Sequence, residues 1–241
     1  TSVGWAAKIV DVATREQARH QSLLSSGVVD ALMWTTAHDF VWFGVSLAAY
    51  TSGPMIALIG RNEGGLTLTQ EAVDAVLDSF HAYFDYGSSD FVTIGRLKSP
   101  VVKIVAKALP IVDIVISDAN KPFVVQHRHA IDDLVEGLLI DDPLDRRSQD
   151  GADKLQSTCA LALQNLALSD IGKGPLRSRD TVMTALRKVA AEESGCGMSK
   201  EACQYASGAL FELDEAVRQT AKAQALTSAV DLSSQHEAVE H

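Results

Sequence analysis

Two segments in the second half of the chain carry hydrophobic residues at helical spacing and are similar to each other. In segment 155–168, apolar residues recur three and four positions apart and cover almost the whole circumference of a helix. A helix that is apolar all round must be buried between neighbours. Similarity between segments a few tens of residues apart is typical of helices stacked as a solenoid. The matching positions are Ala162 with Ala209, Leu163 with Leu210, and Leu166 with Leu213.

The same order of helices is predicted three times along the chain. Near the amino terminus, a capping box opens a helix that ends at Gly27, a second helix covers 28–37, and an apolar third helix covers 39–51. The order returns in segment 121–168 and, in shortened form, in segment 177–214. We therefore predict a single all-α domain over residues 1–241, a solenoid of about four repeats. Its approximate units are 1–53, 54–120, 121–170 and 171–230, followed by a tail at 231–241.

Glycine-rich and charged segments are predicted to be loops between these helices. The predicted units are longer than a compact repeat, and we place the extra residues in loops at 61–65 and 141–151. The second of these segments is crowded with Asp and Arg side chains. The glycines in 172–174 and 195–197 are expected at corners between helices, because neither segment has the pattern of a phosphate-binding loop. Leu176 is accordingly expected to lie in a loop, where its replacement by Ala would cost little stability.

One stretch, 101–117, permits a second interpretation. It is rich in β-branched residues, and Pro110 would interrupt a helix interior at a cost of roughly 3 kcal/mol. Together with segment 55–59 it could form a parallel sheet. The protein could then be an α/β enzyme acting on a small molecule, with Asp113 or Asp118 as an acid at a strand end. We favour instead a long buried helix that Pro110 starts or kinks.

Several of these segments resemble armadillo repeats. Segment 162–167, with the sequence Ala-Leu-Gln-Asn-Leu-Ala, resembles the third helix of the repeat, and segments 27–33 and 130–139 resemble its second helix. The resemblance is clearest from about 123 to 213, and HEAT-type repeats share much of the pattern. It implies a right-handed superhelix whose third helices line a concave groove that binds other polypeptides.

The resemblance also implies where a partner would bind. In peptide-binding armadillo proteins, a ladder of Asn residues on successive third helices clamps the backbone of an extended peptide. Here only Asn165 matches the ladder, and the predicted equivalent positions hold Ala49, Ile111 and Glu212. Glu212 would favour a basic ligand, whereas Asn165 could equally well satisfy nearby backbone groups. The partner-binding residues predicted in this way are Asn165, Glu212, Gln164 and Phe211.

Composition narrows the classes of function. The chain has 241 residues, of which 46% are hydrophobic, and its net charge of −10 disfavours nonspecific binding to nucleic acid or to an anionic membrane. Its three cysteines form no paired framework. No run approaches the roughly twenty apolar residues of a membrane-spanning helix, and the amino terminus does not resemble a signal peptide. We expect a cytoplasmic protein in a reducing setting.

No catalytic or cofactor motif is recognisable. His127 and His129, with Asp132 and Asp133, are the densest set of potential metal ligands, but two histidines two residues apart at a helix corner cannot share a helical face. The two aspartates are better explained by the positive end of the helix that they open. No Gly-x-Ser-x-Gly or His-Glu-x-x-His motif occurs. The sequence therefore predicts a noncatalytic scaffold or regulatory module without metal or cofactor.

A further resemblance concerns the end of the chain. Segment 206–214 and the residues after it resemble the last armadillo repeat that precedes a TIR domain in some multidomain proteins. This implies that the array restrains or assembles a TIR domain of the same chain. It also implies that a nucleotide metabolite binds near basic residues, for which Arg177 and Arg179 are the candidates, although both could equally be solvated surface. Uncapped ends of a solenoid expose apolar faces, which would permit a homo-oligomer.

Overall fold

The computed structural model describes residues 9, 13, 20–37, 41–42, 45–46, 67–85, 100–140, 146–191, 199–215 and 218. Within this part of the chain the regular structure is helical, apart from one pair of two-residue strands, which confirms the predicted all-α class. The longer helices are α3 (Val28–Ala37), α5 (Gln70–Asp85), α6 (Pro100–Ile114), α8 (Ala130–Leu139), α9 (Ala152–Ala167), α11 (Asp180–Ala191) and α12 (Lys200–Leu213). The shorter elements are α2 (His20–Ser25), α7 (Lys121–Gln126), α10 (Asp170–Arg177), the 3₁₀ helix η3 (Arg146–Ser148) and the strands β1 (Val41–Trp42) and β2 (Val45–Ser46).

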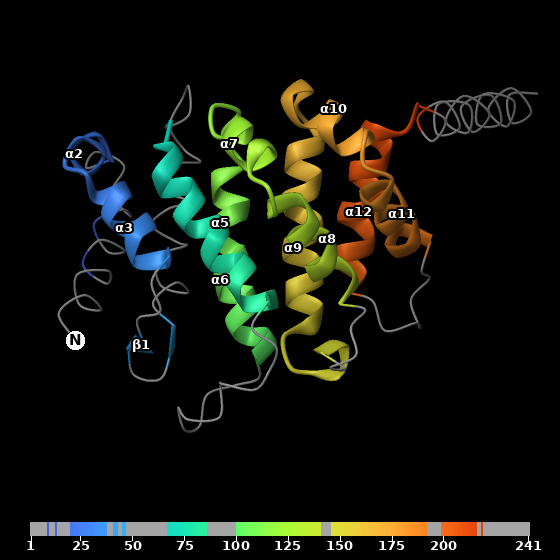
Figure 1. Cartoon of the computed structure of the whole chain (residues 1–241), viewed down its shortest axis with the longest axis horizontal. Coiled ribbons are helices and arrows are strands. Elements are labelled where there is room, and N and C mark those ends of the chain that lie inside the picture. Colours follow the sequence, from blue (N-terminus) through green and yellow to red (C-terminus); the bar gives the residue numbers. More distant parts are fainter. Residues whose placement is uncertain are drawn as a thin grey trace, which may run out of the picture.

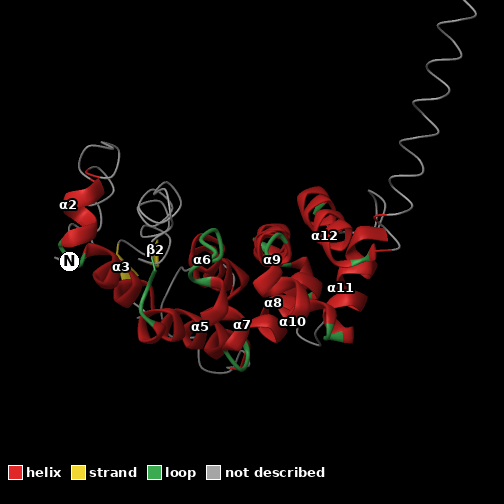
Figure 2. Ribbon diagram, turned by 90° about the horizontal axis from the view of Figure 1, so that it is seen from above, coloured by secondary structure: helices red, strands yellow, loops and turns green. Residues whose placement is uncertain are grey.

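The helices follow one another along the long axis of the molecule in the order of the chain (Figure 1). Seen from above, they form two rows (Figure 2). The inner row contains α6, α9 and α12, with α9 packed against both of the others, and the outer row contains α5, α8 and α11. The short helices α7 and α10 each lead from an inner helix to the next outer one. The array curves toward the inner row, so α6, α9 and α12 line its concave side.

A continuous hydrophobic core lies between the two rows. Its centre is α9, where Leu163, Leu166 and the Cys159 thiol are fully buried. Leu134 of α8 and Leu210 of α12 extend this core on either side of α9. Removal of such apolar surface from water is the main source of stability. Because α9 is apolar on most of its faces, it can be buried only when helices of both rows pack around it.

The helices predicted on either side of the first glycine corner are present. α3 begins directly after Gly27, whose φ of +74° is a left-handed conformation that glycine adopts without steric cost. α8 and α9 likewise occupy the segments predicted for them, and Asp132 and Asp133 stand in the first turn of α8. The spacing of apolar residues is sufficient to predict these helices, because it marks the face that each helix buries.

The predicted apolar helix at 39–51 is wrong where the structure describes it. Val41 pairs with Ser46 and Trp42 with Val45, as two short antiparallel strands. β-Branched and aromatic residues favour strands, and Val41, Trp42 and Val45 are of these types. At the four described residues, β propensity therefore explains the structure better than a helical face does.

In segment 101–117 the strand of the second interpretation is instead a helix. α6 covers Pro100–Ile114, so the strand interpretation is wrong for these residues, and the α/β enzyme loses the strand on which it depended. Pro110 stands inside the helix. The Val115 N–H still donates to the Ile111 carbonyl at 3.0 Å, so helical bonding continues past the proline. Burial of α6 on nearly all sides offsets the cost of the proline.

The corner expected at 172–174 is part of a helix. α10 begins after Ser169, whose hydroxyl accepts a hydrogen bond from the Gly172 N–H at 3.3 Å. Leu176 in the same helix is fully buried, so the expectation that it lies in a loop is wrong. The two glycines gave the misleading signal, because glycine also occurs inside a helix where another backbone approaches closely.

Gly172 is such a position, and its replacement by Ala should destabilise the fold. A Cβ atom there would stand 2.1 Å from the Leu166 carbonyl oxygen of α9, which is backbone and cannot turn away. We expect Gly172→Ala to lower the free energy of unfolding by about 1–3 kcal/mol. A Cβ on Gly174 would meet nothing within 4 Å, so Gly174→Ala should be neutral or stabilising. Urea denaturation of both variants measures the difference, and equal stabilities would contradict the contact.

Other predictions are corrected or lie outside the described residues. Arg146, expected in a solvated charged loop, is 7% exposed and pairs with Glu136 at 3.1 Å. Among the described helices, none is long and apolar enough to cross a membrane. The features that lie outside the described residues are segments 55–59 and 61–65, residues 141–145, the corner at 195–197 and the tail at 231–241.

Candidate functional site

A cavity of about 430 Å³, open to solvent, lies on the inner row of helices. α6 contributes Leu109 and Asp113 to its wall, α9 contributes Thr158 and Leu161, and α12 contributes Tyr205. These three helices line the concave side of the array (Figure 2). A cavity of this size is within the range that holds a small ligand or a side chain of a partner. We call this surface of α6, α9 and α12 the groove.

Asp113 is the unusual member of the cavity wall. Its side chain is buried, with 1% of the residue exposed, and its Oδ2 atom has no hydrogen-bond partner in the described part of the chain. Burial raises the pKa of the Asp113 carboxyl to about 8, because the charged form loses its hydration. The carboxyl is therefore mainly protonated at pH 7. Buried polar groups without a partner are rare, and one that lines a cavity is a candidate ligand-binding group.

Polar groups of α9 and α12 line the same cavity. The hydroxyls of Ser157 and Thr158 donate to the Lys154 carbonyl at 3.1 and 2.6 Å, so their oxygens keep lone pairs that can accept hydrogen bonds. Glu201 accepts a hydrogen bond from the Ser199 hydroxyl at 2.8 Å, and this bond is the main reason that the pKa of Glu201 is lowered. The cavity therefore combines a neutral carboxyl, an ionised carboxylate and hydroxyl acceptors.

Burial on the inner helices corrects the register that was predicted from the sequence. Leu109 and Leu161 are both partly buried and both line the cavity, and each is followed four residues later by a polar residue, Asp113 or Asn165. Residues four apart lie on one face of a helix. Ile111, the predicted equivalent of Asn165, is fully buried and does not line the cavity. Asp113, two residues farther along α6, is the polar residue of this helix in the cavity wall.

Asn165 and Gln164 lie one turn beyond the cavity on α9, and both are partly buried. No described residue makes a hydrogen bond to the Asn165 side chain, so the alternative in which it satisfies neighbouring backbone groups has no support among the described contacts. Gln164 packs against Gly208 of α12, where a Cβ atom would stand 2.1 Å from the Gln164 Nε2 atom. Gln164 therefore contributes to the spacing between α9 and α12.

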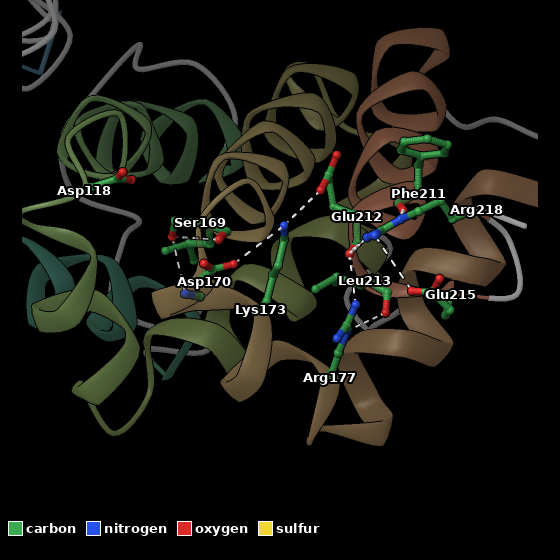
Figure 3. Close-up of polar contacts among 12 residues, drawn as sticks. Asp118, Ser169, Asp170, Lys173, Arg177, Phe211, Glu212, Leu213, Glu215 and Arg218 are labelled. Carbon is green, nitrogen blue, oxygen red and sulfur yellow. Dashed lines mark hydrogen bonds and ion pairs between the residues drawn. The ribbon is translucent and has the colours of Figure 1, made fainter. Parts of the chain in front are cut away.

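Glu212 and Phe211 stand at the carboxyl end of α12 (Figure 3). The Glu212 carboxylate is 25% exposed and pairs with Lys173 of α10, with 3.1 Å between Oε2 and Nζ. Phe211 is 40% exposed, and the Arg218 guanidinium lies 6.0 Å from the centre of its ring. Glu212 follows Tyr205 by two helical turns, so both share one face of α12. None of the partner-binding residues predicted from the sequence lines the cavity; Asn165 and Glu212 stand toward the carboxyl ends of α9 and α12.

Comparison with protein-family models, curated proteins and solved structures finds no match for this chain. The site is therefore interpreted from its own geometry and chemistry.

The two arginines predicted to bind a nucleotide have structural contacts. Arg177 donates to the Leu213 carbonyl at 2.6 Å and to the Glu212 carbonyl at 3.2 Å, which satisfies carbonyl groups at the end of α12 (Figure 3). Arg179 pairs with Asp132 of α8 at 2.9 Å. Neither arginine lines the cavity. Nucleotide binding, regulation of a TIR domain and homo-oligomerisation stay predictions on which these contacts do not bear.

Histidines of α5 and of the corner between α7 and α8 form a second polar cluster. The His81 Nδ1 atom lies 2.9 Å from the buried Asp133 carboxylate, and the His81 ring is stacked on His129 with 3.9 Å between centroids. His127 Nε2 lies 3.2 Å from Asp78. Each carboxylate therefore has a histidine partner, and the cluster joins α5 to α7 and α8. Within the described residues, no group of three or more potential ligands is arranged to hold a metal ion.

Proposed function

We propose that this chain is an armadillo-like, right-handed α-solenoid that binds an extended basic segment of a partner polypeptide in the groove and catalyses no reaction itself. The arrangement of the inner row supports the proposal, because three successive helices present polar side chains to one surface. Asp113 lines the cavity, and Asn165 and Glu212 stand farther along α9 and α12. Packed helices lie about 8–10 Å apart, a distance that two to three residues of an extended peptide span.

Charge in the groove supports a basic partner. The acidic residues Asp153 and Glu201 line the cavity beside the neutral Asp113 carboxyl, and Lys154 is the cationic residue among the described lining residues. Farther along, the Glu212 carboxylate stands beside the groove face of α12. The chain as a whole carries a net charge of −10. Complementary charge speeds association and disfavours acidic competitors, so a Lys- or Arg-containing segment is the best match.

Substitutions along the groove should weaken binding of such a segment without unfolding the protein. We expect Asn165→Ala and Glu212→Gln each to raise the dissociation constant of a Lys- and Arg-containing peptide by about two- to tenfold, the loss of one hydrogen bond or one partly exposed charge contact. Gln is the appropriate replacement at Glu212, because a Lys there would repel Lys173 at 3.1 Å. Fluorescence anisotropy with labelled basic peptides measures the effect, and thermal unfolding checks the fold.

A matched control is available in the outer row. Glu71 is exposed in the first turn of α5, away from the inner row, so Glu71→Gln removes the same charge without touching the groove. It should leave the dissociation constant unchanged. If Glu71→Gln weakens binding as much as Glu212→Gln, the peptide responds only to net charge, and the groove is not its binding site.

A further inference from the structure

The cavity that Asp113 lines has features that fit one kind of ligand more specifically than the rest of the groove does. Asp113 is one of the residues that line the cavity; its carboxyl is buried, and its Oδ2 atom has no partner in the described part of the chain. On the α9 wall of the cavity, the hydroxyls of Ser157 and Thr158 donate to the Lys154 carbonyl, so their oxygens can accept further hydrogen bonds. The cavity thus presents hydrogen-bond acceptors from both α6 and α9.

We propose that this cavity receives the ammonium or guanidinium group of one basic side chain of the bound polypeptide, with Asp113 as its anionic partner, and that the Asp113 proton passes to solvent as the cation enters. The proposal rests on the proposed function, since it assigns a guest to one part of the groove. The step is a proton transfer alone: the carboxyl O–H bond breaks, the carboxylate pairs with the incoming cation, and water or buffer takes the proton.

The shape of the wall suits a long basic side chain. Leu109, Leu161 and the Tyr205 ring supply apolar surface against which the methylene stem of Lys or Arg can pack. The charged end would then reach the Asp113 carboxylate, while remaining N–H groups donate to the Thr158 hydroxyl oxygen on the α9 wall. A buried ion pair is favourable only when such additional hydrogen bonds are made.

None of the other charged groups around the cavity acts as a charged partner of Asp113. Asp153 and Lys154 of α9 are exposed at its edge, and Glu201 and Tyr205 of α12 complete the titratable lining residues. The Lys154 charge acts on Glu201, where it contributes to the lowered pKa of that carboxylate. No charge interaction from any of these four residues contributes to the pKa shift of Asp113, which burial alone explains. The carboxyl therefore remains available for an incoming cation.

Binding should then depend on pH in a defined direction. In the free protein the pKa of Asp113 is about 8, so below that pH each binding event must release close to one proton. The affinity for a basic side chain should rise about tenfold for each pH unit from roughly pH 5.5 to 7.5, and level off above roughly pH 8. A carboxylate that was already ionised would show no such rise.

Carbon-detected NMR of the Asp113 carboxyl in the full chain tests the proposal directly. The probe is Nα-acetyl-lysine N-methylamide, and its Nε-acetylated form, which has the same stem but no charge, is the control. The lysine probe should lower the midpoint of the Asp113 titration by at least one pH unit, and the acetylated control should leave it in place. A midpoint that is the same with and without the lysine probe would overturn the proposal.

Variants provide an independent measurement. Asp113→Asn should weaken binding of the lysine probe at pH 7.5 at least tenfold and abolish its pH dependence. Asp180→Asn, the same change at an exposed residue of α11, should bind as the wild type does. Equal affinities of wild type and Asp113→Asn would contradict the proposal, and the NMR titration decides the matter if that variant fails to fold.

The two proposals can fail separately. If a basic peptide binds along Asn165 and Glu212 but leaves the Asp113 titration unchanged, the groove function stands and the cation site is wrong. If the lysine probe shifts the Asp113 titration while no peptide responds to Asn165→Ala or Glu212→Gln, the cavity binds a cation and the proposed polypeptide groove is wrong.

Discussion

Replacing Asp113 by Asn should make the protein more stable at neutral pH, and the gain should disappear in acid. In the folded chain burial raises the pKa of Asp113 to about 8, whereas in the unfolded chain it is near its ordinary value of 3.8. Below about pH 4 the carboxyl is neutral in both states and carries no ionisation penalty. As the pH rises toward 8, the unfolded chain ionises and the folded chain does not, so the wild type loses about 1.4 kcal/mol per pH unit. Asn cannot ionise and avoids this loss.

Urea denaturation of both proteins at several pH values measures the effect. The free energy of unfolding of Asp113→Asn, relative to wild type, should increase by on the order of 4 kcal/mol between pH 4 and pH 7. Comparison with wild type cancels other titrating groups, such as Asp133, whose pKa is also raised by burial. Asp180→Asn, the same change at an exposed residue, serves as the control. A stability difference between Asp113→Asn and wild type that does not change with pH would mean that the Asp113 carboxylate is hydrated in the folded protein.

Truncation of the buried leucines around α9 should be the other large effect. Leu163→Ala removes a fully buried side chain from the centre of the core and should cost about 2–5 kcal/mol. Leu176→Ala should cost a similar amount, because Leu176 is also fully buried and not in a loop. Leu168 at the end of α9 is 56% exposed, so Leu168→Ala should cost less than about 1 kcal/mol.

Chemical denaturation of the three variants gives the comparison. The account predicts that Leu176→Ala resembles Leu163→Ala and differs from Leu168→Ala. A small effect at Leu176 would mean that α10 does not pack into the core as described. A small effect at Leu163 would contradict the position of α9 as the central helix of the array.

Much of the helical framework could be predicted from the sequence because the pattern of burial is local. α3, α8, α9 and α12 each carry apolar residues at helical spacing, and the Gly27 corner has the conformation that its sequence suggested. The errors occurred where local preference and burial disagree. Val41 and Val45 stand in strands inside an apolar run that looked helical, and α6 is a helix although its residues favour strands. Packing between rows decides such cases, and packing is not local.

The candidate site was predictable only in part for the same reason. Asn165 and Glu212 followed from matched positions in two similar segments, and they stand on α9 and α12, two of the helices that form the groove. In the sequence, Asp113 stands out only as an acid at the end of a possible strand. Its spacing of four residues from Leu109, which matches Leu161 and Asn165, was the available signal. The absence of a partner for its carboxyl depends on three helices meeting in space, and no sequence pattern contains that information.

Hydrogen exchange of the full chain with and without a Lys- and Arg-containing peptide is the most direct test of the central claim, that α6, α9 and α12 form a binding groove. The account predicts slower amide exchange on binding in these three inner helices, with smaller changes in α5, α8 and α11. Protection concentrated in the outer row, or spread evenly over the molecule, would contradict it.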